Sequence, residues 1–320
     1  MSSDTQPALV FESVVKRFGR RLALDAFNMR VPRGITCGLV GSNGAGKTTS
    51  IAIATGLLSC NSGSVNILGD GPFDPAKHSG RVSMMPQDSE LPLYARVRDI
   101  LTFYAQLQGI DRKNIKHDVE RVIEWVHLAD RADDPVRTLS HGMRRRIVVA
   151  QAFLGTPELV ILDEPLSGLD PREVVNIRKL LQRRPEQQTV IISSHNLHEL
   201  ELVCDHIAFI EKGKLVRQDS MDEITGRRQV IHYTLSPGQA LSTTPLSALL
   251  PDATIAIEEN GTVLSCEYSG SEHCDADINR VVLNHLLANE IEILEVRCGK
   301  NLESVYMSHS SKAETVPPAH

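Results

Sequence analysis

The sequence of 320 residues is poor in aromatic side chains and has no long apolar run. Phe, Trp and Tyr make up 4% of the chain, which argues against the aromatic platforms on which single-stranded nucleic acids stack. No segment approaches the roughly 18 consecutive apolar residues of a membrane-spanning helix. Residues 1–10 contain no basic stretch followed by an apolar one, so we expect no secretory signal and a cytoplasmic protein.

Cysteine pairs at metal-site spacing are also missing. The six cysteines are scattered, with no Cys-x-x-Cys pair: Cys37, Cys60, Cys204, Cys266, Cys274 and Cys298. Reduced thiols in a cytosolic protein explain this distribution better than a disulfide framework or a zinc site.

The net charge of −6 comes from the last third of the chain. Residues 226–320 carry 6 basic and 12 acidic side chains, whereas the charges before them balance. An acidic C-terminal portion is a poor partner for nucleic acid or an anionic membrane surface, so we expect no nucleic-acid partner. The change in composition also predicts a second domain.

Apolar runs and helical patterns alternate through the first 225 residues, which predicts a three-layer α/β core. A basic turn is expected at 16–21. Wholly apolar runs bounded by polar residues suit buried parallel strands. The expected strands are 9–15, 26–31, 35–40, 159–162 and 190–192, and the expected helices are 47–58, 97–109, 115–128 and 172–181.

The C-terminal region from residue 229 onward has a different order of expected strands and helices. Strands are expected at 229–235, 253–259, 262–268 and 291–296, and helices at 237–250 and 275–289. Asn260-Gly261 between two alternating runs is a strong hairpin signal. The order βαββαβ predicts a smaller ferredoxin-like α+β domain, followed by a disordered tail at 309–320.

A glycine-rich loop carries the clearest chemistry. It follows the apolar strand at 35–40, precedes a helix and matches G-x-x-x-x-G-K-[ST]. Glycines let successive backbone N–H groups point inward at phosphate oxygens, and the helix adds the positive end of its dipole. Lys47 can reach the β- and γ-phosphates of ATP and Thr48 can ligate Mg²⁺. The expected nucleotide-binding residues here are Gly41, Ser42, Asn43, Gly44, Ala45, Gly46, Lys47, Thr48 and Thr49.

A second strand supplies the acids that such a site needs. The apolar run 159–162 ends in Asp163 and Glu164. Asp163 can hold Mg²⁺ at the strand tip, and Glu164 can polarise a water for attack on the γ-phosphate. Without the loop upstream, the same run would indicate only a strand entering a polar turn.

Together with further motifs, the glycine-rich loop and the acidic strand end follow an order that resembles the nucleotide-binding subunit of ATP-binding-cassette (ABC) transporters. The resemblance covers residues 8–225. Gln87 in Met84-Met85-Pro86-Gln87-Asp88 matches the family's Q-loop, and His195 matches its switch histidine. The remaining matches are the signature at Leu139-Ser140-His141-Gly142-Met143, the D-loop at Ser167-Gly168-Leu169-Asp170, and Phe18 at the adenine-stacking position.

The resemblance implies a role for each match. Gln87 would sense Mg²⁺ or the attacking water, and His195 would contact the γ-phosphate. Ser140, Gly142 and Met143 would bind the ATP of a second copy, so a head-to-tail dimer is implied. A separate transmembrane permease is also implied, which places the chain at the cytoplasmic membrane face, with its docking surface expected at 87–108.

The signature departs from the family's L-S-G-G-Q at His141 and Met143. His141 can donate a hydrogen bond or make the site pH-sensitive, since histidine is the side-chain type that changes charge near neutral pH. Altered signatures followed by Met-Arg-Arg-Arg, and the closing segment 301–306, resemble the drug-resistance and nodulation-type exporter ATPases. The implied domains are a cassette at 1–227 with a helical subdomain at 88–155, and an accessory domain at 228–308.

Simpler interpretations compete with several of these. Phe18 can be a packing residue, and the pair His195 and His198 can suggest a metal, although no third ligand is apparent. Arg144, Arg145 and Arg146 are expected to form a solvated helix face. The alternatives for the whole chain are a soluble ABC ATPase acting on ribosomes or DNA, and a non-catalytic subunit.

Overall fold

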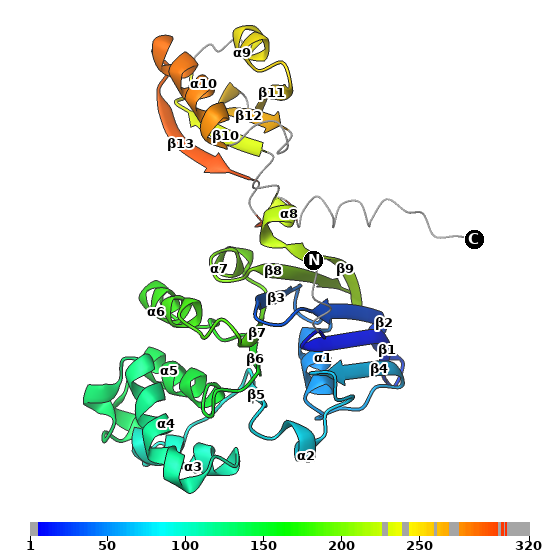
Figure 1. Cartoon of the computed structure of the whole chain (residues 1–320), viewed down its shortest axis with the longest axis vertical. Helices are drawn as coiled ribbons and strands as arrows, with labels where there is room; N and C mark the ends of the chain where they lie inside the picture. The colour runs from blue at the N-terminus through cyan, green and yellow to red at the C-terminus, as the bar shows by residue number, and fades with distance from the viewer. Residues whose placement is uncertain are drawn as a thin grey trace. The chain divides into compact units, whose positions relative to one another are not determined.

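The computed structural model describes residues 6–225, 230–238, 243–258, 261–268, 275–299, 302–303 and 305 (Figure 1). The chain divides into two compact units, Met1–Gln218 and Asp219–His320. Within the described residues, no helix is long and apolar enough to cross a membrane.

A six-stranded sheet forms the centre of the first unit. Its strand order is β5 (Val82–Met85), β6 (Leu159–Asp163), β7 (Thr189–Ser194), β3 (Thr36–Val40), β8 (His206–Glu211) and β9 (Lys214–Ser220). The pairs from β5 to β8 are parallel. Every residue of β3, β6 and β7 is buried, as expected for strands covered on both faces. The carboxyl ends of these three strands therefore meet at one edge.

A second, antiparallel sheet has the order β2 (Arg21–Val31), β1 (Leu9–Phe18) and β4 (Ser62–Ile67). The helix α1 (Lys47–Ala54) contacts strands of both sheets. The predicted basic turn at 16–21 was wrong: β1 and β2 continue through most of it, and only Gly19 and Arg20 turn. Strand pairing outweighed the local polar composition, since Arg17 pairs with Leu22 and Phe18 with Arg21.

Helices α3 (Val97–Leu107), α4 (Arg112–Trp125) and α5 (His141–Ala152) gather into one group around their own apolar core (Figure 1). Helix α4 begins three residues earlier than predicted because the Asp111 side chain accepts a hydrogen bond from Lys113 N–H and caps it. The predicted helix 47–58 ends at Ala54 instead, where Gly56 adopts φ 72°. The remaining helices of this unit are α2 (Pro75–His78), α6 (Pro171–Gln182) and α7 (Leu197–Glu201).

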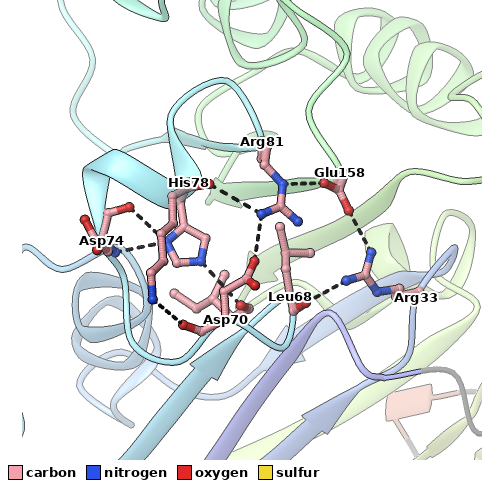
Figure 2. Close-up of polar contacts among 9 residues, drawn as sticks. Arg33, Leu68, Asp70, Asp74, His78, Arg81 and Glu158 are labelled. Carbon is pink, nitrogen blue, oxygen red and sulfur yellow. Dashed lines mark hydrogen bonds and ion pairs between the residues drawn. The ribbon is translucent and has the colours of Figure 1, made fainter.

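An ion-pair network lies at the start of β6, and Figure 2 shows Glu158 between two arginines. Glu158 accepts hydrogen bonds from Arg81 Nε at 2.6 Å and Arg33 Nη1 at 2.7 Å. Arg81 also donates to Asp70 at 2.7 Å. The two hydrogen bonds that Glu158 accepts lower its pKa below the usual value, and the bond from Arg81 has the larger effect. The network joins the segments that enter β3, β5 and β6.

The second unit contains α8 (Met221–Thr225), β10 (Val230–Leu235), α9 (Thr244–Leu249), β11 (Ala253–Glu258), β12 (Val263–Tyr268), α10 (Asp275–Ala288) and β13 (Ile293–Cys298). Its sheet is antiparallel, with the order β11-β12-β10-β13. The predicted order of strands and helices is observed from β10 to β13. Within the described part of the predicted helix 237–250, the helix runs from Thr244 to Leu249. The predicted turn residue Asn260 and the tail 309–320 lie outside the described residues.

Candidate active site

The loop between β3 and α1 has the backbone that its glycines permit. Gly44 and Gly46 adopt φ 82° and 118°, where side chains are strained. Gly41 is needed for a different reason, since a Cβ there would lie 2.3 Å from the Ile210 backbone oxygen. The loop therefore packs against β8 while its centre stays open to a ligand.

Lys47, the first residue of α1, points back into this loop. Its side chain is 6% exposed, and Nζ donates to the Gly41 carbonyl at 2.7 Å. The same nitrogen lies 3.5 Å from Glu164 Oε1. The loop thus presents a buried cation and the N-terminus of α1, a combination that favours phosphate.

The acidic pair at the end of β6 is held by Ser193 on β7. Asp163 lies directly opposite Ser193 in the parallel register, and Ser193 Oγ donates to Asp163 Oδ1. The same hydroxyl accepts the Glu164 N–H at 2.9 Å. Ser193 is fully buried, so one side chain orients both acids in a setting without water.

Glu164 occupies an unusual backbone position between two basic side chains. Its φ is 49°, a left-handed conformation that is strained for a residue with a Cβ. His195 Nδ1 lies 3.1 and 3.0 Å from the two carboxylate oxygens. With Lys47 on the other side, the carboxylate is fixed in place, as a group that orients a reacting water must be.

These elements surround a cavity of about 460 Å³. Of the residues predicted to bind nucleotide or catalyse, most line it: Phe18, Ser42, Asn43, Gly44, Gly46, Lys47, Thr48, Thr49, Gln87, Glu164 and His195. Phe18 is 47% exposed, and Lys16 Nζ lies 5.1 Å from its ring centroid, so the ring is not a core residue. Gly41, Ala45 and Asp163 lie behind this surface as buried supports.

The signature residues are not part of this cavity lining. Ser140 is exposed and caps α5, where its Oγ accepts the Met143 N–H at 3.2 Å. A Cβ on Gly142 would lie 2.3 Å from Glu173 Cγ, so this glycine lets α5 approach α6. Asp170 caps α6 by accepting N–H groups of Arg172 and Glu173, each at 3.0 Å. The cavity that contains Lys47 is therefore not lined by any of these four predicted residues: Ser140, Gly142, Met143 and Asp170.

The prediction of a solvated face for Arg144–Arg146 was wrong, since all three are partly buried and the Nε of Arg144 is buried. The Arg146 side chain is 12% exposed; it pairs with Glu173 and donates to the Val126 carbonyl at 2.9 Å. Arg145 is partly buried and donates to backbone carbonyls of the site. A run of like charges on a helix spans more than half a turn, so its members face different surroundings.

Several residues of the site were missed from the sequence. Arg21 and Ser167 line the cavity, and Ser193 supports the acids. Arg21 lay within the predicted basic turn, and Ser167 was only part of a motif. The signal for Ser193 was a polar residue ending an otherwise apolar strand just before His195.

A parallel sheet, a glycine-rich loop that holds a buried lysine, and an acidic strand end beside it define a P-loop nucleoside triphosphatase. The ABC transporter family profile matches residues 24–167. The chain belongs to the ATP-binding subunits of ABC transporters, and it is an ATPase.

Curated relatives and a solved structure agree with this assignment. The bacitracin transport ATP-binding protein BcrA of Bacillus licheniformis is 35% identical over 70% of this chain and 73% of its own. The linearmycin resistance ATP-binding protein LnrL of Bacillus subtilis is 28% identical over 93% of this chain and 96% of its own. The Nod factor export ATP-binding protein I of Ralstonia nicotianae is 30% identical over 81% of each chain. The structure of cbiO1 from Clostridium perfringens, part of the ABC transporter complex cbiONQ, has TM-score 0.63 and 27% identity, covering 69% of this chain and 91% of its own.

Proposed function

We propose that this chain hydrolyses Mg²⁺-ATP in the cavity beside Lys47 and thereby powers export through a separate membrane-spanning partner. The observation that carries the proposal is the position of the Glu164 carboxylate, 3.5 Å from Lys47 Nζ and 3.0 Å from His195 Nδ1. A carboxylate held between a phosphate-binding cation and a histidine is placed to orient the water that attacks the γ-phosphate.

The other lining residues have roles that follow from their positions. Backbone N–H groups of residues 41–49 and the start of α1 bind phosphate oxygens, and Lys47 turns from the Gly41 carbonyl to the β- and γ-phosphates. Phe18 offers an exposed ring for stacking on adenine. His195 donates to the γ-phosphate, and Gln87, which lines the same cavity, contacts the water or the metal.

The site fits a magnesium ion. Among the described residues, no group hydrogen-bonds the buried Asp163 Oδ2, whereas Oδ1 is held by Ser193. A buried carboxylate oxygen without a donor suits a metal, and Thr48 is exposed in the cavity, whose lining does not include Asp163 itself. Asp163, Thr48 and Gln87 would hold the ion. When bound, Mg²⁺ neutralises phosphate charge and orients the β- and γ-phosphates.

A second copy completes each site in this proposal. Ser140, Gly142, Met143 and Asp170 do not line the cavity, although the first three surround the N-terminus of α5. A capped helix N-terminus with an exposed serine suits an anion. We assign this surface to the γ-phosphate of the partner's ATP, in a head-to-tail dimer.

Export rests on the relatives, whose names describe linearmycin resistance, bacitracin transport and Nod factor export. The docking surface proposed at 87–108 carries large apolar side chains in the open. Leu93, Tyr94, Phe103 and Leu107 are 47%, 85%, 56% and 65% exposed. Exposed apolar groups on neighbouring segments suit a protein partner. We place the helical subdomain that carries this surface at 88–155 and the chain at the cytoplasmic membrane face.

The second unit is proposed as a ferredoxin-like domain spanning 228–308, after a cassette at 1–227. The strand order β11-β12-β10-β13, with every pair antiparallel, supports this topology. Helices α9 and α10 belong to its apolar core through Leu246 and Ile278. It would stabilise or regulate the dimer of cassettes.

The dimer is tested with the full chain carrying Glu164→Gln, which should bind ATP without consuming it. Sedimentation with Mg²⁺-ATP should show a dimer that disappears when nucleotide is removed. The matched control adds Ser140→Asp, because aspartate still caps α5 but repels the partner's phosphates. This variant should bind ATP as a monomer. A dimer that Ser140→Asp leaves intact would contradict the arrangement.

The partner is tested by tagging the full chain in cells and isolating it with and without ATP. Copurification of a multi-span membrane protein is expected, and charged replacements of Tyr94 and Phe103 should release it. Recovery with ribosomes or DNA, and no membrane protein, would favour the alternative of an ABC ATPase outside transport.

A further inference from the structure

Three consecutive arginines in the first two turns of α5 have different surroundings. Arg144 and Arg145 both line a cavity of about 300 Å³ beside residues 89–93, and Arg146 holds the end of α4. Of the three, Arg145 also contacts the backbone of the segments that carry Glu164 and Gln87. This helix also begins with Ser140 and Gly142, the residues assigned to the ATP of the second copy.

Arg145 binds three backbone carbonyls of the hydrolytic machinery. Its Nη2 donates to the Glu164 oxygen, Nε to the Pro165 oxygen at 3.0 Å, and Nη1 to the Gln87 oxygen at 3.2 Å. The first two belong to the turn that follows β6, and the third to the loop that follows β5. One side chain on α5 therefore joins the two segments that carry Glu164 and Gln87, the residues proposed to contact the attacking water.

One of these contacts is made to a residue with a strained backbone conformation. Glu164 adopts φ 49°, and such a conformation persists only where its surroundings determine it. Its N–H is held by Ser193 and its carbonyl by Arg145, so both sides of this residue are fixed. Burial lowers the pKa of Arg145, while the nearby charges of Asp163, Asp88 and Glu164 oppose that shift. The guanidinium thus stays a cation among acids.

We propose that Arg145 is a positioning residue that couples α5 to the catalytic geometry: it holds Glu164 and Gln87 in place by their backbones. A shift of α5, whose N-terminus would meet the second copy's ATP, then moves both groups together. The inference rests on the proposed function of Glu164 and Gln87. Arg145 touches neither substrate nor metal in this role, so its loss should affect the rate and not the binding of ATP.

The test is a graded series at one position in the full chain: Arg145→Lys, Arg145→Gln and Arg145→Met. The side chains offer five N–H donors in arginine, three in lysine, two in glutamine and none in methionine. We expect kcat for ATP hydrolysis to fall by about 100-fold in Arg145→Met, since misplacing a reacting group by about 1 Å has that effect. Lysine and glutamine should recover part of the rate, while KM and the Kd of a fluorescent ATP analogue stay within about twofold.

Arg144→Met is the matched control, because it removes the same charge from the same helix but, within the described residues, no hydrogen bond to the site. It should keep the wild-type kcat. The inference is overturned if Arg145→Met matches Arg144→Met in kcat, or if kcat and ATP affinity fall together. If the methionine variant does not fold, the lysine and glutamine variants decide on the same criteria. A wild-type chain that does not hydrolyse ATP would contradict the proposed function. If Glu164→Gln lowers kcat and the Arg145 variants do not, only the role of Arg145 is contradicted.

Discussion

Ser193→Ala removes a single oxygen atom but should strongly lower the stability of the first unit. The serine hydroxyl donates to Asp163 Oδ1 and accepts the Glu164 N–H at 2.9 Å, and the residue is fully buried. Alanine removes one oxygen without a steric clash. It leaves a carboxylate oxygen and a strained backbone N–H without a partner, because water cannot reach them.

The magnitude follows from those two contacts. A hydrogen bond to a charged group contributes roughly 1.5–3 kcal/mol, and an unsatisfied buried donor costs about 1–3 kcal/mol. Since the two share one hydroxyl, we expect a loss of about 3 kcal/mol. In a unit of this size, 1 kcal/mol shifts Tm by about 2–4 °C, so Tm should fall by roughly 6–12 °C.

The assay can report the first unit alone. Trp125 is the only tryptophan of the chain, lies in α4 and packs on Phe153 with ring centroids 4.6 Å apart. Its fluorescence on heating therefore follows the cassette. Ser194→Ala is the matched control: it removes one hydroxyl from the same strand and frees a single N–H, that of Asn196 at 3.0 Å. Equal Tm shifts for the two variants would refute the reasoning.

Three further predictions concern other parts of the chain. Gly142→Ala should lower Tm because its Cβ meets Glu173 Cγ, and overpacking costs about 1–3 kcal/mol. Glu173→Ala also removes the ion pair with Arg146, so the effect of Gly142→Ala is compared in the wild-type and Glu173→Ala backgrounds. Gly142→Ala should lower Tm less in the Glu173→Ala background, and an equal loss in both would argue against the clash. The hydrogen bond from Arg81 lowers the pKa of Glu158 in the folded protein below the ordinary value of 4.5. The ionised Glu158 therefore stabilises the fold fully above pH 4.5, and this stabilisation is lost as the pH falls through the lower pKa of the folded protein. Wild type should therefore lose more Tm in acid than Glu158→Gln; parallel pH profiles would contradict this. Burial raises the pKa of Cys37 to about 12, so a maleimide at pH 8 should modify this thiol only after unfolding, and mass mapping of native protein checks it.

Contiguous features were predictable from the sequence, and contacts between distant segments were not. The strand, glycine loop and helix around Lys47 follow one another between Thr36 and Ala54, so composition and spacing were sufficient. The apolar strand ending in Asp163 was recognisable for the same reason. The basic turn at 16–21 failed because pairing between β1 and β2, which is not a local property, extended the strands.

Ser193 and Arg145 show what local patterns omit. Ser193 acts on Asp163 only because β6 and β7 pair in one parallel register, thirty residues apart along the chain. Arg145 reaches carbonyls at Glu164 and Gln87, 19 and 58 residues away, and backbone oxygens carry no residue identity to recognise. Its neighbours Arg144 and Arg146 made a solvated face plausible. Only the packing of α5 on the sheet separates the three.

The central claim is that Glu164 makes this cavity a hydrolytic site, and ATP turnover by the full chain tests it most directly. The comparison is wild type, Glu164→Gln and Glu158→Gln, the last being the same substitution at the opposite end of β6. Because positioned acid–base groups contribute about 10²–10⁴-fold, Glu164→Gln should lower kcat at least about 100-fold without weakening ATP binding, and Glu158→Gln should turn over like wild type at neutral pH. Equal rates for wild type and Glu164→Gln would contradict the account.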